Sequence, residues 1–298
     1  MTKRGVPSTF GICILLCVAA VGCGKPEDPR PSRIAFAVDR KGTNRDILVI
    51  DPAGGDPQPI VPADTFDETP AWSPDGFMLL FASGRDGHYG IYSWEGGKLG
   101  KVLMAQYRDC GPSWSPDGRR IAFMSNRDTS WEIYTMTASG KDEKRLTNDP
   151  ASDTWPAWSP DGGSILFLSD RGGQQDVYTM KPDGSEVKPL TNDRAWDGRP
   201  AWSPDGKWIA WPSAREGKEA IYLMDPAGKN VRRLTPLDSE AYEPSWSPDG
   251  KWIAFASNRN GFRELWIMNA DGTAPRMVTH LNGMIHTPAW SPFLPPAK

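Results

Sequence analysis

Four aspartates recur at one position of a repeated motif, and they are the carboxylates best placed to bind a ligand. Each stands three residues before the proline of a Pro-x-Trp-Ser-Pro sequence, at Asp67, Asp109, Asp153 and Asp197. Ca²⁺ takes six to eight oxygen ligands, which carboxylates supply. With Glu68 and Glu243 nearby, they could form a calcium site or a site for a basic ligand. Alternatively, each aspartate accepts backbone N–H bonds and fixes the turn before the next strand.

Large aromatic side chains accompany these aspartates in the same segments between repeats. They are Phe66, Tyr107, Trp155, Trp196 and Tyr242. Aromatic residues outside regular strands and rimmed by charge are typical anchors of protein interfaces. The pattern predicts a binding surface, and the alternative is burial between neighbouring repeats.

Arginine recurs as well, at residues 40, 85, 127, 171, 215 and 259. Acidic residues follow in several repeats, at Asp46, Glu132, Asp176 and Glu264. This spacing predicts an ion pair that braces the loop between the two segments. An exposed pair of this kind contributes under about 1 kcal/mol.

Motifs of catalysis are scarce. The sequence has no Gly-x-Ser-x-Gly nucleophile turn, no glycine-rich phosphate loop and no paired-cysteine zinc motif. Of three histidines, His88 is remote from His280 and His286, and two histidines without a fixed carboxylate make a weak metal site. We therefore predict no catalytic residue and no cofactor. A formal net charge of -3 also argues against nucleic-acid binding.

The first residues are typical of a bacterial leader. Lys3 and Arg4 precede an apolar run over 10–22, which is too short to span about 30 Å of hydrocarbon. Ala-Val-Gly-Cys at 20–23 resembles the lipobox, in which the cysteine is acylated after cleavage. We expect a signal peptide over 1–22, lipid on Cys23, and a proline-rich tether to residue 33. An ordinary signal peptide cut elsewhere and an uncleaved anchor are the alternatives.

Six Trp-Ser-Pro copies determine the expected fold. Their tryptophans are spaced by 42, 44, 44, 44 and 44 residues. Five of the copies are followed by an Ile-Ala-Phe type segment, and four by an Ile-Tyr-x-Met type segment. In the intervening Ser-Pro-Asp-Gly, proline presets φ and glycine accepts positive φ, which favours a tight hairpin. Four antiparallel strands per repeat predict an all-β, six-bladed propeller over 34–292, with a tail at 293–298.

The two ends of the repeat array predict how the ring closes. The first Ile-Ala-Phe, at residue 34, has no Trp-Ser-Pro before it, and the last Trp-Ser-Pro, at residue 290, has no second strand after it. We expect the C-terminal strand to pair into the first blade. Closure removes the exposed sheet edges that invite aggregation.

Connectivity then defines two faces. If each inner strand starts at one face, the two hairpin turns of its blade lie at the opposite face, here called the turn face. The longer loops lie where the inner strand starts, here called the loop face, and variable loops on a rigid scaffold usually carry binding. We expect the four aspartates to stand around the channel mouth on the loop face.

The repeat Pro-Ala-Trp-Ser-Pro-Asp-Gly, with Ile-Ala-Phe, Ser-x-Arg and Ile-Tyr-x-Met, resembles the WD40-like repeat of the TolB family, and less closely the propellers of prolyl oligopeptidases. TolB carries an α/β domain ahead of its propeller, for which we find no room. The resemblance implies a monomeric, non-enzymatic envelope protein that binds another envelope protein or a cell-wall component, reaching the membrane through its lipid alone. The alternatives are a metal-dependent propeller lyase or lactonase and a module that captures sugars or peptides.

Overall fold

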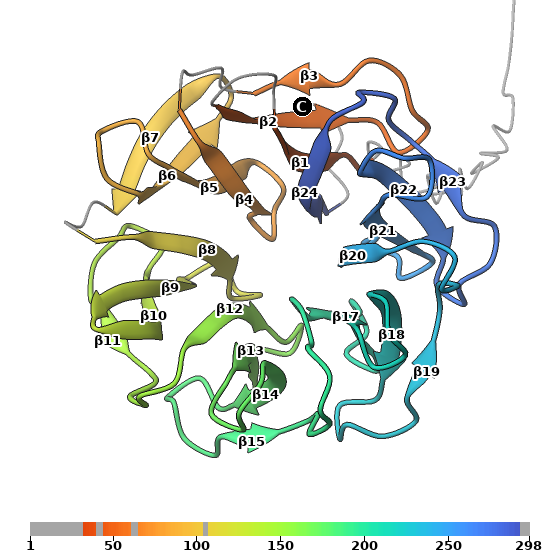
Figure 1. Ribbon diagram of the computed structural model, residues 1–298. Helices are drawn as coiled ribbons and strands as arrows, with labels where there is room; N and C mark the ends of the chain where they lie inside the picture. Colours follow the sequence, from red (N-terminus) through yellow and green to blue (C-terminus); the bar gives the residue numbers. More distant parts are fainter. Residues whose placement is uncertain (1–31, 40–43, 61–64, 104–106, 293–298) are drawn as a thin grey trace, which may run out of the picture.

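Six four-stranded antiparallel sheets surround a central axis (Figure 1). The computed structural model describes residues 32–39, 44–60, 65–103 and 107–292. The six-bladed all-β prediction is confirmed. The leader, Cys23, most of the tether and the tail lie outside the described residues. In the described part no helix is long and apolar enough to cross a membrane.

The blades follow one another along the chain, each from its inner to its outer strand, except that blade 1 takes its inner strand from the C-terminus. Blade 1 consists of β24 (Met284–Trp290), β1 (Ile34–Asp39), β2 (Arg45–Ile50) and β3 (Gln58–Pro59), and blade 2 of β4 (Asp67–Trp72), β5 (Met78–Ser83), β6 (Gly90–Glu95) and β7 (Lys98–Leu103). Blade 3 consists of β8 (Asp109–Trp114), β9 (Arg120–Asp128), β10 (Ser130–Thr137) and β11 (Lys144–Arg145), and blade 4 of β12 (Asp153–Trp158), β13 (Ile165–Ser169), β14 (Asp176–Met180) and β15 (Lys188–Pro189). Blade 5 consists of β16 (Ala201–Trp202), β17 (Ile209–Ser213), β18 (Ala220–Met224) and β19 (Arg232–Arg233), and blade 6 of β20 (Ala241–Trp246), β21 (Trp252–Ser257), β22 (Glu264–Asn269) and β23 (Arg276–Met277).

The ring closes through the C-terminal strand, as predicted. Antiparallel pairing of β24 with β1 sets Ile34 opposite Trp290. Beyond the strands, the Arg33 backbone N–H donates to Ser291 Oγ at 2.7 Å. Trp290 Nε1 donates to Ser32 Oγ at 2.6 Å. The two ends of the described chain therefore meet at the turn face.

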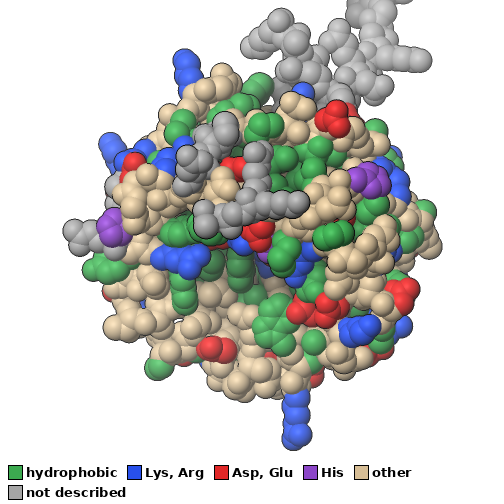
Figure 2. Space-filling model, turned by 45° about the horizontal axis from the view of Figure 1, so that its top comes forward, with side chains coloured by type: hydrophobic (Ala, Val, Ile, Leu, Met, Phe, Trp, Pro, Cys, Tyr) green, Lys and Arg blue, Asp and Glu red, His purple; other side chains and the backbone are tan. Residues whose placement is uncertain are grey.

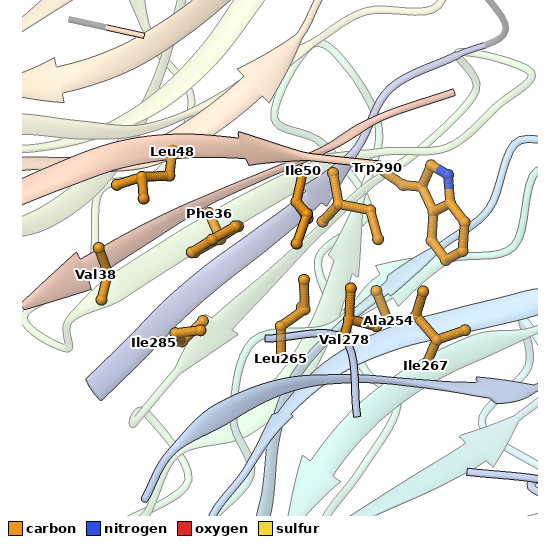
Figure 3. Close-up of a cluster of buried hydrophobic side chains, with 11 residues drawn as sticks. Phe36, Val38, Leu48, Ile50, Ala254, Leu265, Ile267, Val278, Ile285 and Trp290 are labelled. Atoms are coloured by element: carbon orange, nitrogen blue, oxygen red, sulfur yellow. The ribbon is translucent and has the colours of Figure 1, made fainter. Parts of the chain in front are cut away.

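Apolar side chains fill the space between neighbouring blades. Phe36 and Ile50 of blade 1 pack with Leu265 and Ile267 of blade 6 in one buried cluster (Figure 3). Burying one such side chain contributes about 1.5–3 kcal/mol. Because each cluster spans at least two blades, every blade stabilises the next one.

The first hairpin of each blade follows the turn chemistry that its sequence indicates. In blade 4, Ser159 Oγ donates to Asp161 Oδ1 at 2.5 Å, and the same oxygen accepts the Gly163 N–H at 2.9 Å. Gly162 has a φ of 71°, which a side chain would strain. These short turns hold the inner strands in register around the channel.

Candidate functional site

The four recurrent aspartates lie inside their blades and not around the channel mouth. Their exposed fractions are 1 % for Asp67 and 0 % for the other three. Each carboxylate contacts the arginine at or just past the end of strand two of its own blade, in the pairs Asp67–Arg85 (2.8 Å), Asp109–Arg127 (2.9 Å), Asp153–Arg171 (2.7 Å) and Asp197–Arg215 (3.5 Å). The basic partner of each aspartate is therefore the chain's own arginine.

The predicted pairing with the acids of the third strand is wrong for Arg127 and Arg171, whereas Arg40, predicted to pair near Asp46, lies outside the described residues. In blade 3 the acid that opens the third strand, Glu132, is held by the fourth strand: Thr147 Oγ1 and Arg145 both donate to it at 2.6 Å. Arg127 turns instead to Asp109 of the inner strand. Its guanidinium also lies 4.7 Å from the centre of the Tyr134 ring. The arginine thus links the inner strand to the aromatic core of its blade.

Blade 6 provides a natural comparison, because Ala241 takes the place of the aspartate. Arg259 still lies over the Phe255 ring, at 5.5 Å, and the Trp266 ring, at 4.5 Å. Burial lowers the pKa of Arg259, and Asp238 opposes that shift. The arginine therefore packs on the aromatic rings of its blade in the four blades whose inner strand supplies an aspartate, and also in blade 6, which has none.

The four aspartates do not fit a calcium ion. Calcium needs six to eight oxygens converging on one point. Each of these carboxylates contacts an arginine of its own blade, so the four carboxylates lie in four separate blades. In the described part of the chain, no group of three or more acidic, histidine or cysteine side chains could hold a metal ion.

The residue just before the first proline of the motif faces the channel. Inner strands carry a β-bulge there, as between Glu68 and Ala71. The bulge residue has positive φ in several blades, among them Thr69 (57°) and Trp155 (55°). Thr69 Oγ1 accepts the N–H of Gly111, its equivalent in the next blade, at 3.3 Å. Contact between equivalent residues of neighbouring blades is possible only along the channel wall.

A charged network covers the loop-face mouth near blades 1 to 3. Arg45 donates to Asp39 at 2.6 Å and to Glu68 at 2.8 Å. Arg108 reaches the other oxygen of Glu68 at 3.2 Å, with its guanidinium 4.4 Å from the Tyr89 ring centre. The space-filling view shows hydrophobic, basic and acidic side chains intermixed around the central hollow (Figure 2).

The same network continues across the ring closure into blade 6. His286 has its Nε2 3.0 Å from Asp39 and its Nδ1 3.3 Å from Arg263. Arg263 lies 3.5 Å from the centre of the Tyr242 ring, whose hydroxyl donates to Glu240 at 2.6 Å. Both histidine nitrogens are thus engaged.

Sequence reasoning missed most of this network. A signal was present, because one loop position recurs at the repeat spacing, at Arg45, Tyr89, Trp131, Gln175, Glu219 and Arg263. The residue type at this position differs from blade to blade, except that blades 1 and 6 both have arginine. Nothing in such a varied column indicates that the side chains converge.

The predicted aromatic anchors divide into two groups. Phe66, Tyr107 and Trp196 are exposed by 42, 48 and 43 %. Trp155 and Tyr242 are half-buried, each beneath an arginine. Loop-face side chains that the prediction omitted are also exposed, namely Phe262, Leu281 and Met284.

Trp196 is held in place by a close backbone approach. A Cβ at Gly198 would lie 2.8 Å from the Trp196 ring and 2.6 Å from Pro212 Cγ. Only glycine lets the indole lie this near the strand. The backbone at Gly198 therefore packs directly against the exposed ring.

Comparison with known proteins decides the family. The family model for the TolB β-propeller domain matches residues 93–294. The chain belongs to the TolB β-propeller family. It is similar to TolB from Acinetobacter baumannii, with 29 % identity and a TM-score of 0.79, over 88 % of this chain and 67 % of that one. It is also similar to a putative TolB from Agrobacterium tumefaciens, with 24 % identity and a TM-score of 0.69, over 85 % of this chain and 90 % of that one.

Enzymes also share this propeller architecture. Oligogalacturonate lyase from Vibrio parahaemolyticus has 16 % identity and a TM-score of 0.55, over 85 % of this chain and 73 % of that one. At that identity the likeness concerns the fold alone. No curated protein matches the chain in sequence.

Proposed function

We propose that this TolB-family propeller is a non-enzymatic, monomeric lipoprotein of the bacterial cell envelope. Its loop face docks an envelope protein or a cell-wall component. The observation that carries the proposal is that exposed aromatic side chains, Phe66, Tyr107 and Trp196, share the loop face with a network of ion pairs. Aromatic anchors next to ordered charge are typical of protein interfaces.

The path of the chain between Cys23 and the first blade supports a loop face that points away from the membrane. Ser32 lies at the turn face, where it accepts the indole N–H of Trp290. Eight residues lie between it and Cys23, and an extended chain spans at most about 30 Å over that length. Lipid on Cys23 would therefore keep the turn face near the membrane. The loop face would point away from it, toward partners.

The state of His286 supports a role outside catalysis. Both ring nitrogens are engaged, one with Asp39 and one with Arg263. A general base needs a nitrogen within reach of a substrate proton. The charged groups here bind one another, which suits a rigid docking surface.

Site-specific crosslinking in intact envelopes tests the proposal. A photoreactive amino acid replaces Tyr107 on the loop face or, as a matched control, Phe77 on the turn face. Both side chains are 48 % exposed, so neither position is more accessible to solvent. We expect a discrete envelope adduct at Tyr107 and none at Phe77. An adduct at Phe77 alone, or at neither position, would contradict the proposal.

A further inference from the structure

The turn-face end of the channel is a cavity of about 360 Å³. All six inner strands wall it, and we call it the turn-face funnel. Its lining repeats in rings, with prolines at 70, 112, 156, 200, 244 and 288 and tryptophans at 72, 114, 158, 202, 246 and 290. Alanine and serine lie between these rings. A volume above 300 Å³ is in the range of small-ligand sites.

Arg199 is the single charged residue among the described residues that line the funnel. Its side chain lies over the Trp155 ring, with 5.3 Å between the guanidinium carbon and the ring centre. Within the described chain, its guanidinium makes no hydrogen bond and no ion pair. A guanidinium has five N–H donors. The donors of Arg199 are therefore left for a ligand.

Two other channel-facing side chains at this position have hydrogen-bond partners within the chain. Thr69 accepts the Gly111 N–H, and Glu243 Oε2 accepts the Thr287 N–H at 2.8 Å. Burial lowers the pKa of Arg199, and Glu243 opposes that shift. Arg199 is half-buried in the funnel wall, so its guanidinium is open to the cavity.

We propose that the turn-face funnel binds the C-terminal carboxylate of a peptide that ends in an apolar residue. Guanidinium and carboxylate match in a bidentate pair. The proline and tryptophan rings suit the apolar side chain. Three residues separate Arg199 from Trp202 near the rim, about 10 Å along an extended strand. A peptide that enters the funnel with its C-terminus first brings a carboxylate to this depth.

This site lies at the opposite end of the channel from the loop-face anchors. The two proposals rest on different residues. Failure of either proposal would leave the other intact.

Calorimetry with the purified full chain tests the funnel. The probe is N-acetyl-Pro-Leu-Phe with a free carboxylate, compared with its C-terminal amide. We expect the acid to bind at least tenfold more tightly, because a charge-assisted pair is lost in the amide. A third probe, amidated at its end and carrying an internal aspartate, should bind no better than the amide. Equal binding of the third probe and the acid would overturn the assignment to a chain terminus.

Variants locate the binding. Arg199→Gln should weaken acid binding at least tenfold and abolish the difference between acid and amide, whereas Arg199→Lys should retain part of it. Arg119→Gln, whose side chain is 86 % exposed on a turn-face hairpin, is the matched control and should bind like the parent. No binding of the acid to the parent protein, or unchanged binding to Arg199→Gln, would overturn the proposal. If Arg199→Gln does not fold, the comparison of acid and amide on the parent decides.

Discussion

Removing one partner of the Asp67–Arg85 pair should strongly destabilise the propeller. The side chains are 1 % and 14 % exposed, so solvent screens their interaction little. Asp67→Ala leaves the Arg85 guanidinium between the Phe81 and Tyr92 rings without that carboxylate. Breaking a buried pair in this way costs about 3–5 kcal/mol. For a domain of this size that lowers Tm by about 6–15 °C.

Removing the arginine instead of the aspartate should lower the free energy of unfolding by less. Arg85→Met leaves Asp67 beside Ser83, and burial raises the pKa of this carboxyl while Ser83 and Arg85 oppose the shift. Without the arginine, Asp67 can take up a proton, which limits the penalty. The double variant removes both charges, so it should be more stable than the sum of the single changes indicates by about 1 kcal/mol or more.

Urea unfolding of the four proteins measures this coupling. Arg259→Met is the matched control, because Ala241 leaves that arginine without an inner-strand aspartate. It should destabilise the protein less than Asp67→Ala does. Additive single changes, or an Arg259→Met effect as large as that of Asp67→Ala, would refute the account of the buried pairs.

Three further predictions follow from the same geometry. Ala241→Asp supplies the missing partner of Arg259 and should raise Tm by a few degrees; a lower Tm would show that blade 6 cannot accept the pair. Burial raises the pKa of Glu219 to about 7, Arg263 opposes the shift, and Glu240 and Glu243 add to it. Because this folded-state pKa exceeds the unfolded one, the stability that Glu219 contributes is lost as pH rises through about 7. Glu219→Gln should therefore raise Tm more at pH 8 than at pH 5, and equal gains would contradict the assignment. Truncation after Leu281 removes β24 and should give insoluble or protease-sensitive protein, whereas a truncated chain that melts like the parent would mean that the ring closes elsewhere.

The fold was accessible from the sequence because its determinants are local and repeated. Each Ser-Pro-Asp-Gly turn sets its own hairpin, and six copies at nearly constant spacing leave little choice but a ring. The closing strand followed from which motifs were missing at the two ends. Pairing of Ile34 with Trp290 confirms that reasoning.

The site was only partly accessible, because it depends on which way side chains point. The β-bulge before each first proline shifts the alternation of the inner strand. Asp67 therefore turns into its blade, while Thr69 faces the channel. The contact between Asp39 and His286 joins residues 247 positions apart, and no local pattern indicates it. The exposure of Trp196 could be predicted because a large aromatic side chain in a loop does not depend on strand register.

Capture from envelopes with one loop-face variant tests the docking claim most directly. Trp196→Ala removes an exposed anchor, which should cost about 2 kcal/mol or more, or some thirtyfold in affinity. Trp202→Ala, which removes a ring packed against the core between blades, is the matched tryptophan control and should lower Tm sharply. We predict that the protein with Trp196→Ala keeps the parent Tm within a few degrees and no longer retains the envelope partner that the parent captures. Equal capture by that variant and the parent would contradict docking through the loop face.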